Sequence, residues 1–210
     1  MKAFYTILFL CLGAVANAQQ IPIPFGSYYT GYNPAITSWN PFDKNPNIIL
    51  SSAFLKATSA LVSGYQMVRC NKVCSTGVKQ YFEVKVGAAG FDLYVGFDNG
   101  SGSLSAQPGS GSNAVSYYTS LGEIRVNGTG VQYGLATATT GDIIDILYDG
   151  NITVTFYKNH TIIGTAQTVT GGNYYPMVGR GSGVNATSST ANFGATTPIY
   201  TYATYTLGPP

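Results

Sequence analysis

Residues 141–164 read GDIIDILYDGNITVTFYKNHTIIG, and this stretch decides the fold class. It contains three runs of β-branched and aromatic residues: 143–148, 152–158 and 161–163. Runs of this length that are closed by Gly, Asn or Asp are typical of β-strands. Asp149-Gly150 separates the first two runs, and Asp-Gly is favoured in a type I′ turn, where both central residues need positive φ. The stretch therefore predicts a three-stranded meander with a type I′ hairpin at Asp149-Gly150.

Alternation of apolar and polar residues continues on the N-terminal side of this meander. In residues 81–86, every second side chain is apolar, which predicts a strand with one buried face and one solvated face. On the solvated face we expect Glu83 to balance Lys85 or Lys158. The alternation predicts the following buried core: Phe82, Val84, Val86, Val95, Phe97, Ile144, Ile146, Val154, Phe156 and Phe193. We expect Trp39, the only tryptophan, to be packed as well.

The composition of the chain is consistent with one all-β domain. Helical periodicity is absent after Ala18, no period of 20–50 residues repeats, and 210 residues can form a single β-sandwich. Charged residues make up only 9% of the chain and its formal net charge is +2, so no basic stripe is available to bind nucleic acid. Residues 99–114 (NGSGSLSAQPGSGSNA) predict a long connection that is either flexible or functional.

The N-terminal residues have the pattern of a secretion signal. A basic residue, Lys2, precedes an apolar run, and Ala16-Asn17-Ala18 fits the small-x-small pattern of a cleavage site. The apolar run is shorter than the roughly 20 residues that a membrane-spanning helix needs. We therefore expect a signal peptide at residues 1–18, a Pro- and Tyr-rich arm at 19–38, a β-sandwich domain at 39–210, and a secreted protein.

The remaining cysteines and the sequons bear on this secreted state. Cys70 and Cys74 are four residues apart, and in an oxidising compartment we expect a disulfide; free thiols are the alternative. A metal site would need further ligands, and His160 is the only histidine. Glycosylation sequons begin at five positions, each in a predicted turn: Asn99, Asn127, Asn151, Asn159 and Asn185.

The order of several short motifs resembles the SPRY domain family over about Trp39 to Phe193. The motifs are Gly77–Val84, Tyr94-Val95-Gly96-Phe97, Gly141-Asp142-Ile143-Ile144, Val154–Asn159, Tyr175-Pro176-Met177-Val178 and Ala191-Asn192-Phe193-Gly194. The opening at Ser38–Leu50 is similar to that of microbial and viral members. Asp145 and His160 stand where the family usually has glycine, and the hairpin at Asp149 is shorter than usual. The resemblance implies a bent, concanavalin A-like sandwich of two antiparallel sheets that binds protein through loops without cofactors.

The sequence lacks the residue patterns that catalysis or metal binding would need. Asp142 and Asp145 point to opposite faces of one strand, while Asp145 and Asp149 share a face at about 13 Å, beyond the spacing of glycosidase carboxylates. No Gly-x-Ser-x-Gly motif is present, and the single histidine lies in a predicted turn. Asp98-Asn99 and Asp149-Gly150-Asn151 lack a third carboxylate for calcium. We expect a protein that is not an enzyme and that needs no metal.

The remaining interpretations are a binding module, a structural or surface-coat protein, and a lectin. Of these we favour the binding of a protein partner, with a glycan as the alternative ligand. In SPRY domains that capture peptides, the resemblance implies a site built from inter-strand loops. By this matching the candidate contact residues are Arg180, Tyr117, Tyr118, Tyr65 and Arg69, since arginine and tyrosine often dominate interfaces.

Overall fold

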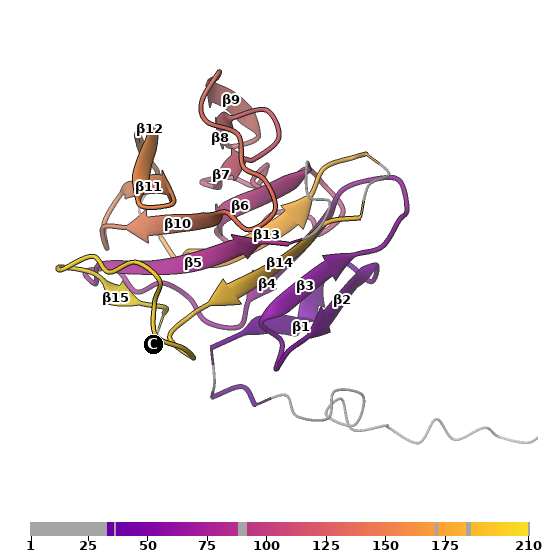
Figure 1. Ribbon diagram of the computed structural model, residues 1–210, viewed down its shortest axis with the longest axis horizontal. Helices are drawn as coiled ribbons and strands as arrows, with labels where there is room; N and C mark the ends of the chain where they lie inside the picture. Colours follow the sequence, from indigo (N-terminus) through magenta and orange to yellow (C-terminus); the bar gives the residue numbers. More distant parts are fainter. Residues whose placement is uncertain (1–32, 36, 88–91, 171, 184–185, 210) are drawn as a thin grey trace, which may run out of the picture. The chain divides into compact units, whose positions relative to one another are not determined.

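The computed structural model describes residues 33–35, 37–87, 92–170, 172–183 and 186–209, all within a compact unit at Gly31–Pro210. The expected signal peptide, most of the arm and Asn185 lie outside the described residues. Within them every regular element is a strand, and no helix long and apolar enough to cross a membrane is found (Figure 1). The strands are β1 (Trp39–Lys44), β2 (Ile48–Ser51), β3 (Lys56–Ser59), β4 (Gln66–Cys70), β5 (Gln80–Val86), β6 (Leu93–Asp98), β7 (Val115–Tyr118), β8 (Glu123–Val126), β9 (Thr129–Gln132), β10 (Ile143–Tyr148), β11 (Thr153–Lys158), β12 (Thr161–Thr168), β13 (Tyr175–Arg180), β14 (Ser188–Asn192) and β15 (Thr206–Leu207).

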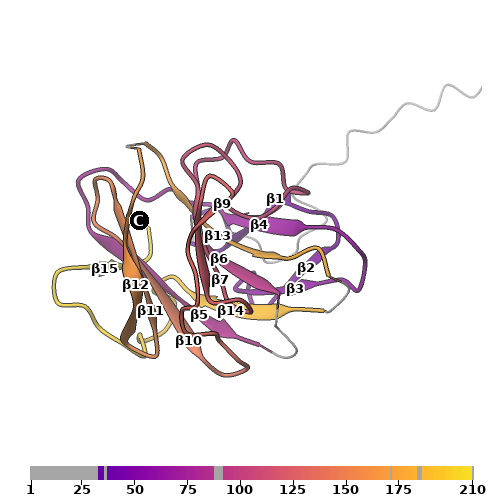
Figure 2. The same ribbon diagram turned by 90° about the horizontal axis from the view of Figure 1, so that it is seen from above.

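These strands form two sheets, which are packed face to face. The seven-stranded sheet has the order β1-β4-β13-β6-β7-β8-β9, and the eight-stranded sheet has the order β12-β11-β10-β5-β14-β3-β2 with β15 beside β5 (Figure 2). All strand pairs are antiparallel except β15 with β5, which is parallel. The predicted all-β sandwich of two antiparallel sheets is confirmed, with this one parallel addition.

The space between the sheets is filled by the side chains that alternation predicts. Every residue of the predicted core is buried, from Trp39 to Phe193. Trp39 packs edge-on against Phe193 at a centroid distance of 4.9 Å, and Phe82 of one sheet packs against Phe97 of the other at 5.4 Å. Such aromatic pairs prefer edge-to-face geometry because the ring edge is positive and the ring face is negative.

The two turns of the meander differ from the predicted assignment. The connection at Asp149 contains four residues, 149–152, and only Gly150 has positive φ, so the type I′ hairpin predicted there is wrong. The Asp149 carboxylate instead accepts the N–H groups of Asn151 and Thr153, which stabilises the longer turn. The two-residue turn with positive φ at both positions is Asn159-His160, at 49° and 66°. Asparagine tolerates this conformation better than most residues.

Two irregular segments lie along the outer faces of the sheets. The connection 99–114 follows the seven-stranded sheet, where Leu104 O accepts the N–H of Met67 at 3.0 Å and Pro108 O accepts the hydroxyl of Ser116 at 3.3 Å. Residues 196–208, which we call the C-terminal segment, cross the eight-stranded sheet and end in β15. The long connection of the sequence is therefore held in place by defined hydrogen bonds.

Candidate functional site

Several inter-strand connections meet at one end of the seven-stranded sheet. The antiparallel register pairs Arg180 with Gln66 on β4 and with Leu93 on β6, and pairs Tyr118 with Tyr94. Residues 60–65, 119–122 and 181–183 are consequently brought to the same end, which we call the loop end. This end contains or adjoins four of the five predicted contact residues.

Arg180 is not the solvated loop residue that the sequence predicts. It is the last residue of β13 and is 0% exposed. Its guanidinium donates to the carbonyl oxygens of Ala60 at 2.7 Å and Gly64 at 3.0 Å, and also to that of Val62. Burial lowers the pKa of Arg180, and the nearby Asp92 carboxylate opposes this effect. Arg180 therefore holds the backbone of residues 60–64 in place from the inside of the domain. A partner cannot contact it, because it is completely buried.

The two neighbouring tyrosines have different roles. Tyr117 is fully buried between the sheets, and its hydroxyl donates to Ala136 O, so it belongs to the core. Tyr118 is half-buried on the outer face, where its ring stacks on Tyr94 with a centroid distance of 4.1 Å and an interplanar angle of 7°. Its hydroxyl donates to Asp92 Oδ1 at 2.5 Å, and burial followed by this bond raises the pKa of Tyr118. Only Tyr118 of this pair offers a surface to a partner.

The surface of the loop end carries exposed apolar side chains that we did not predict from the sequence. Leu61 and Leu121 are 71% and 61% exposed, and Val62 is 41% exposed. Tyr65 is half-buried in the same connection as Leu61. Three strand spacings separate β4 from β7, so these side chains span about 15 Å. The apolar pair Leu61-Val62 within a Ser- and Gly-containing loop was the signal that could have identified this patch.

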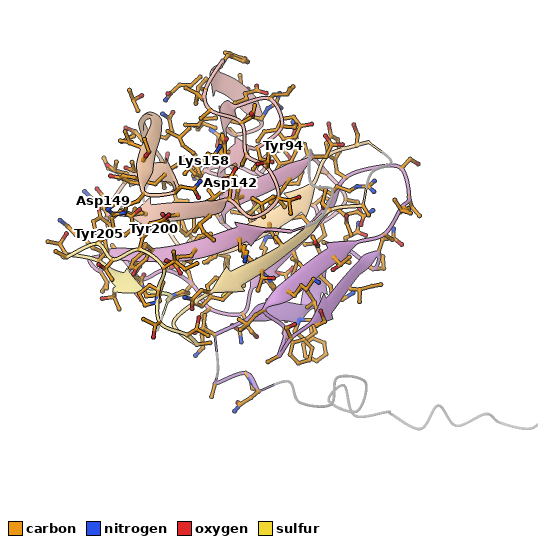
Figure 3. All side chains as sticks on the ribbon, viewed as in Figure 1. Tyr94, Asp142, Asp149, Lys158, Tyr200 and Tyr205 are labelled. Carbon is orange, nitrogen blue, oxygen red and sulfur yellow. The ribbon has the colours of Figure 1, made fainter. Side chains whose placement is uncertain are left out.

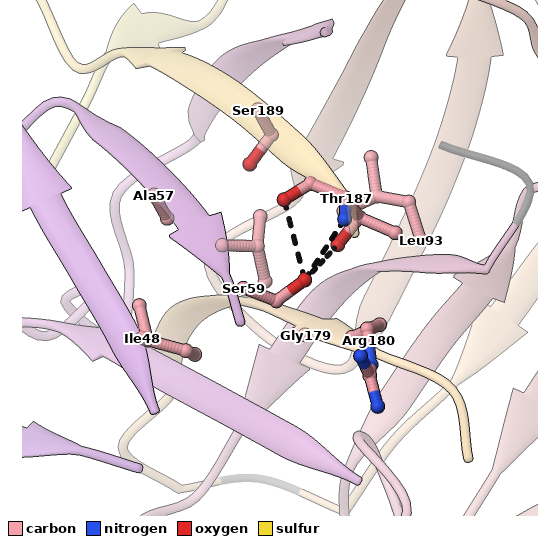
Figure 4. A pocket seen from close by; sticks show the side chains of 9 residues that line it. Ile48, Ala57, Ser59, Leu93, Gly179, Arg180, Thr187 and Ser189 are labelled. Atoms are coloured by element: carbon pink, nitrogen blue, oxygen red, sulfur yellow. Dashed lines mark hydrogen bonds between the residues drawn. The ribbon is translucent and has the colours of Figure 1, made fainter. Parts of the chain in front are cut away.

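The cavity that the described residues enclose beneath the loop end is too small for a ligand. A cavity of about 10 Å³ lies between the sheets and is lined by Ser59, Leu93, Arg180 and Thr187, among others (Figure 4). The hydroxyls of Ser59 and Thr187 are hydrogen-bonded to each other at 2.9 Å across it. A volume of this size holds about one water molecule. What the described residues of the loop end present to a ligand is therefore their surface.

Arg69, the fifth predicted contact residue, is also buried. It lies on β4, donates from Nε to Asp98 Oδ1 at 2.8 Å and from a terminal nitrogen to Asp43 Oδ1 at 2.9 Å, and its side chain is 4% exposed. A further bond from Arg69 to Gly102 O fixes the connection 99–114. The prediction that Arg69 is an accessible contact is wrong, because its donors are used within the domain.

Cys70 and Cys74 are two buried free thiols, so the predicted disulfide is not formed in this structure. The N–H of Cys74 donates to Tyr174 O at 2.7 Å, and the thiol of Cys70 lies 3.7 Å from Asn71 Oδ1. Burial raises the pKa of Cys70 to about 12 and also raises that of Cys74. Oxidation requires the thiolate, which is disfavoured for both groups.

Four of the five sequon asparagines are described, and all four lie in turns or bends or directly after a strand. Asn127, Asn151 and Asn159 are exposed, and Asn99 is half-buried. The amide of Asn159 already donates to Asp142 Oδ1 at 2.7 Å and accepts the N–H of Ile143 at 2.9 Å. Glycosylation at these positions stays a prediction.

The carboxylates of the eight-stranded sheet have an arrangement that the sequence did not predict. Glu83 is 2% exposed and stands opposite Asp145 in the register, so the predicted solvated position of Glu83 beside Lys85 or Lys158 is wrong. Lys158 instead pairs with Asp142 at 3.1 Å (Figure 3). Among the described residues, no three Asp, Glu, His or Cys side chains gather in a way that could hold a metal ion.

Comparison with known proteins identifies the family. The SPRY domain profile matches residues 79–196, which is more than half of the chain. A search of curated proteins finds no match.

Solved structures show the same fold at low sequence identity. A human SPRY domain superposes with a TM-score of 0.58 at 20% identity, covering 72% of this chain and 98% of its own. The SPRY domain of human HERC1 gives 0.61 at 15% identity, covering 76% and 100%. The PSpry domain of TRIM65 gives 0.58 at 13% identity, covering 74% and 91%. The match of the profile over residues 79–196, on a sandwich shared with these domains, shows that this chain belongs to the SPRY domain family.

Proposed function

We propose that this chain is a secreted binding protein that captures a protein partner at the loop end. SPRY domains are protein-interaction modules and are generally not enzymes. The observation that supports the loop end is its exposed apolar patch, Leu61, Val62 and Leu121, beside the half-buried rings of Tyr65 and Tyr118. Apolar and aromatic side chains surrounded by polar loops are the usual centre of a protein interface.

The support beneath this patch favours binding without large rearrangement. Three carbonyl groups of residues 60–64 are held by the Arg180 guanidinium. Tyr118 is fixed by stacking on Tyr94 and by its bond to Asp92. A surface that is already ordered loses less conformational entropy on binding, which raises affinity. The partner that fits is a protein segment with apolar side chains, and the buried Arg180 acts as a positioning residue.

The secreted state is part of the proposal and rests on residues 1–18. Lys2, the apolar run that follows it and Ala16-Asn17-Ala18 are the features of a cleaved signal. The opening at Ser38–Leu50 supports a member of the microbial or viral type. Intact mass of the protein from culture medium should correspond to a chain that begins at Gln19. Retention of residues 1–18, or failure to reach the medium, would contradict secretion.

A crosslinking experiment tests the binding surface. A photoreactive amino acid is placed at Leu61 and the protein is irradiated in the extracellular medium of its source. Crosslinked species are identified by mass spectrometry, and the affinity of each purified partner is measured by calorimetry. Leu61→Asp and Leu121→Asp should each weaken binding at least tenfold, because a carboxylate placed in an apolar contact is desolvated without a partner.

Two exposed apolar residues of the other sheet provide matched controls. Ile49 on β2 and Ile162 on β12 are 65% and 54% exposed, and Ile49→Asp and Ile162→Asp should leave the affinity unchanged. Equal effects of all four substitutions would remove the loop end as the site. A glycan array tests the alternative ligand: specific glycan binding that survives Leu61→Asp would favour a lectin.

A further inference from the structure

A row of polar side chains crosses the outer face of the eight-stranded sheet. The register aligns Tyr157 on β11, Asp145 on β10, Glu83 on β5 and Asn192 on β14. Asp145 is 0% exposed and Glu83 is 2% exposed, so two carboxyl groups lie side by side on adjacent strands and both are buried. Directly opposite residues on antiparallel strands have Cβ atoms about 5 Å apart.

The C-terminal segment covers this pair and supplies two of its hydrogen-bond donors. The Tyr202 hydroxyl donates to Asp145 Oδ2 at 2.8 Å, and the N–H of Tyr200 donates to Glu83 Oε1 at 2.9 Å. The third donor is the amide of Asn192, at 2.9 Å from Glu83 Oε2. Asp145 Oδ1 is buried without a hydrogen-bond partner. All three donors are neutral groups, so none of them compensates a negative charge.

The rings around Tyr202 enclose the pair further. Tyr81, Tyr157 and His160 each lie with ring centroids 5.1 Å from that of Tyr202, and Tyr205 lies at 6.4 Å. Tyr200, labelled with Tyr205 in Figure 3, stacks on His160 at 5.1 Å. This aromatic surround encloses Asp145, whereas Glu83 lies at its edge and lines a cavity of about 190 Å³ together with Lys85 and Asn192.

The charged groups that face the C-terminal segment do not pair with the carboxyl groups. Lys85 lies two residues beyond Glu83 on the same face of β5, and Lys79 lies over the ring of Tyr205 at 5.6 Å. Asp149 is a further negative charge near Tyr205. No ion pair joins Glu83 or Asp145 to a cation within the described part of the chain. Ionising the fully buried Asp145 carboxyl group beside Glu83, with no cation to compensate its charge, is costly, so Asp145 retains a proton.

We propose that the C-terminal segment is a proton-controlled cover: it lies closed over the eight-stranded sheet while the Glu83–Asp145 pair holds a proton, and it opens when that proton is lost to solvent. Opening admits water to both carboxylates and exposes the rings of Tyr81 and Tyr157. This device is on the sheet opposite the loop end and does not depend on the proposed partner site.

The direction of the pH dependence follows from the closed and open states. Burial raises the pKa of Asp145 to about 7 in the closed state; the Tyr202 hydrogen bond opposes this shift and the Glu83 charge adds to it. In the open state the carboxyl group is solvated and its pKa returns to about 4. The closed state therefore binds one more proton between these values. The equilibrium constant for opening should rise about tenfold per pH unit from pH 4 to pH 7 and then level off.

Amide hydrogen exchange of the full chain, followed by NMR at pH 5 to 8, measures this opening directly. The N–H groups of Tyr200, Thr206 and Gly208 bond to Glu83 Oε1, Lys79 O and Tyr81 O, so their protection reports closure. After correction for the intrinsic rate, their protection factors should fall at least tenfold between pH 5 and pH 7. Amides of β6 in the other sheet should keep their protection and so report global stability.

Substitutions separate the carboxyl pair from other titrating groups. Asp145→Asn keeps the shape and the acceptor for Tyr202 but cannot ionise, so protection should become independent of pH. Glu83→Gln removes only the charge that adds to the effect of burial, so the profile should remain and level off at a lower pH. Two further variants remove other titrating groups. In His160→Asn the imidazole is replaced by a residue that tolerates the positive φ of that position. In Asp142→Asn the partly exposed carboxylate that pairs with Lys158 is lost. Asp142→Asn should keep the profile of the unchanged protein. His160→Asn also removes ring contacts with Tyr200 and Tyr202, so it should lower protection at every pH but keep its dependence on pH.

Two results would overturn the proposal. One is a protection factor at Tyr200, Thr206 and Gly208 that does not change between pH 5 and pH 7 in the unchanged protein. The other is a pH profile that survives in Asp145→Asn, or that disappears in His160→Asn. Preserved β6 protection in each variant shows that the domain is folded, so these results refer to the cover alone.

Discussion

Arg69 on β4 reaches past β13 to Asp98 on β6, and the two buried side chains meet at 2.8 Å between Nε and Oδ1. This ion pair connects strands that are not neighbours in the seven-stranded sheet. Through Gly102, Arg69 also holds the start of the connection 99–114. One buried guanidinium thus fixes both the sheet and the segment that covers it.

Arg69→Ala should lower the free energy of unfolding by about 3–5 kcal/mol, because it leaves the fully buried Asp98 carboxylate without a cation. Urea denaturation followed by circular dichroism measures the change. Lys158→Ala is the matched control, since the Lys158–Asp142 pair is partly exposed and should cost less than about 1 kcal/mol. Similar losses in the two variants would show that the Arg69 pair contributes no more than a surface pair.

Phe156→Ala should cost about 3–5 kcal/mol, because the ring is completely buried between the sheets and its removal leaves a cavity. Ile49→Ala removes a side chain that is 65% exposed and should cost only about 0.5 kcal/mol. Equilibrium unfolding in urea, with equal slopes for both variants, provides the comparison. A small loss for Phe156→Ala would mean that the register of β11 is displaced by one residue.

The buried thiols predict slow chemical modification. In a Cys11→Ser chain, Cys70 and Cys74 should react with Ellman's reagent at pH 8 only slowly, because burial raises both pKa values and limits access. In guanidinium chloride without reductant, both thiols should react rapidly. Absence of reactive thiols in the denatured, non-reduced protein would demonstrate the disulfide that this structure lacks.

Asp142 should stabilise the domain at neutral pH and lose this effect in acid. Partial burial acts to raise its pKa, but hydrogen bonds from Thr139, Asn159 and Lys158 outweigh it, and the net pKa is lowered. A lowered pKa gives stability that is present above the unfolded pKa of about 4 and is lost as pH falls. Asp142→Asn should thus lower the melting temperature at pH 7 and have little effect at pH 3. A difference that grows in acid would contradict this assignment.

Local alternation was enough to predict the sandwich and its core, because a strand with one buried face repeats every two residues. Phe82, Val84 and Val86 follow this rule on β5, and each is buried. The same rule placed Glu83 in solvent, since it assumes that the outer face of a strand is uncovered. The C-terminal segment covers that face. It lies more than 100 residues away in sequence, so the residues next to Glu83 cannot indicate that it is there.

The candidate contacts failed for a related reason. Arg180 stands between two glycines, which is typical of a loop, yet β13 continues to it because Leu93 and Gln66 pair with its backbone. Its acceptors, Ala60 O and Gly64 O, lie 120 and 116 residues away in sequence. Contacts of this separation determine whether an arginine is a surface contact or an internal support, and they are set by topology.

The parallel pairing of β15 with β5 has a consequence for biosynthesis. Thr206 and Leu207 pair with Gln80 and Tyr81, and Pro209 accepts a hydrogen bond from Thr37, 172 residues earlier. Contacts of such long range form slowly and only after the intervening chain is available. Until residues 196–208 have been synthesised and can fold, the outer face of β5 remains bare. Chaperones that recognise exposed aromatic strands would therefore have access to Tyr81 until this segment has docked.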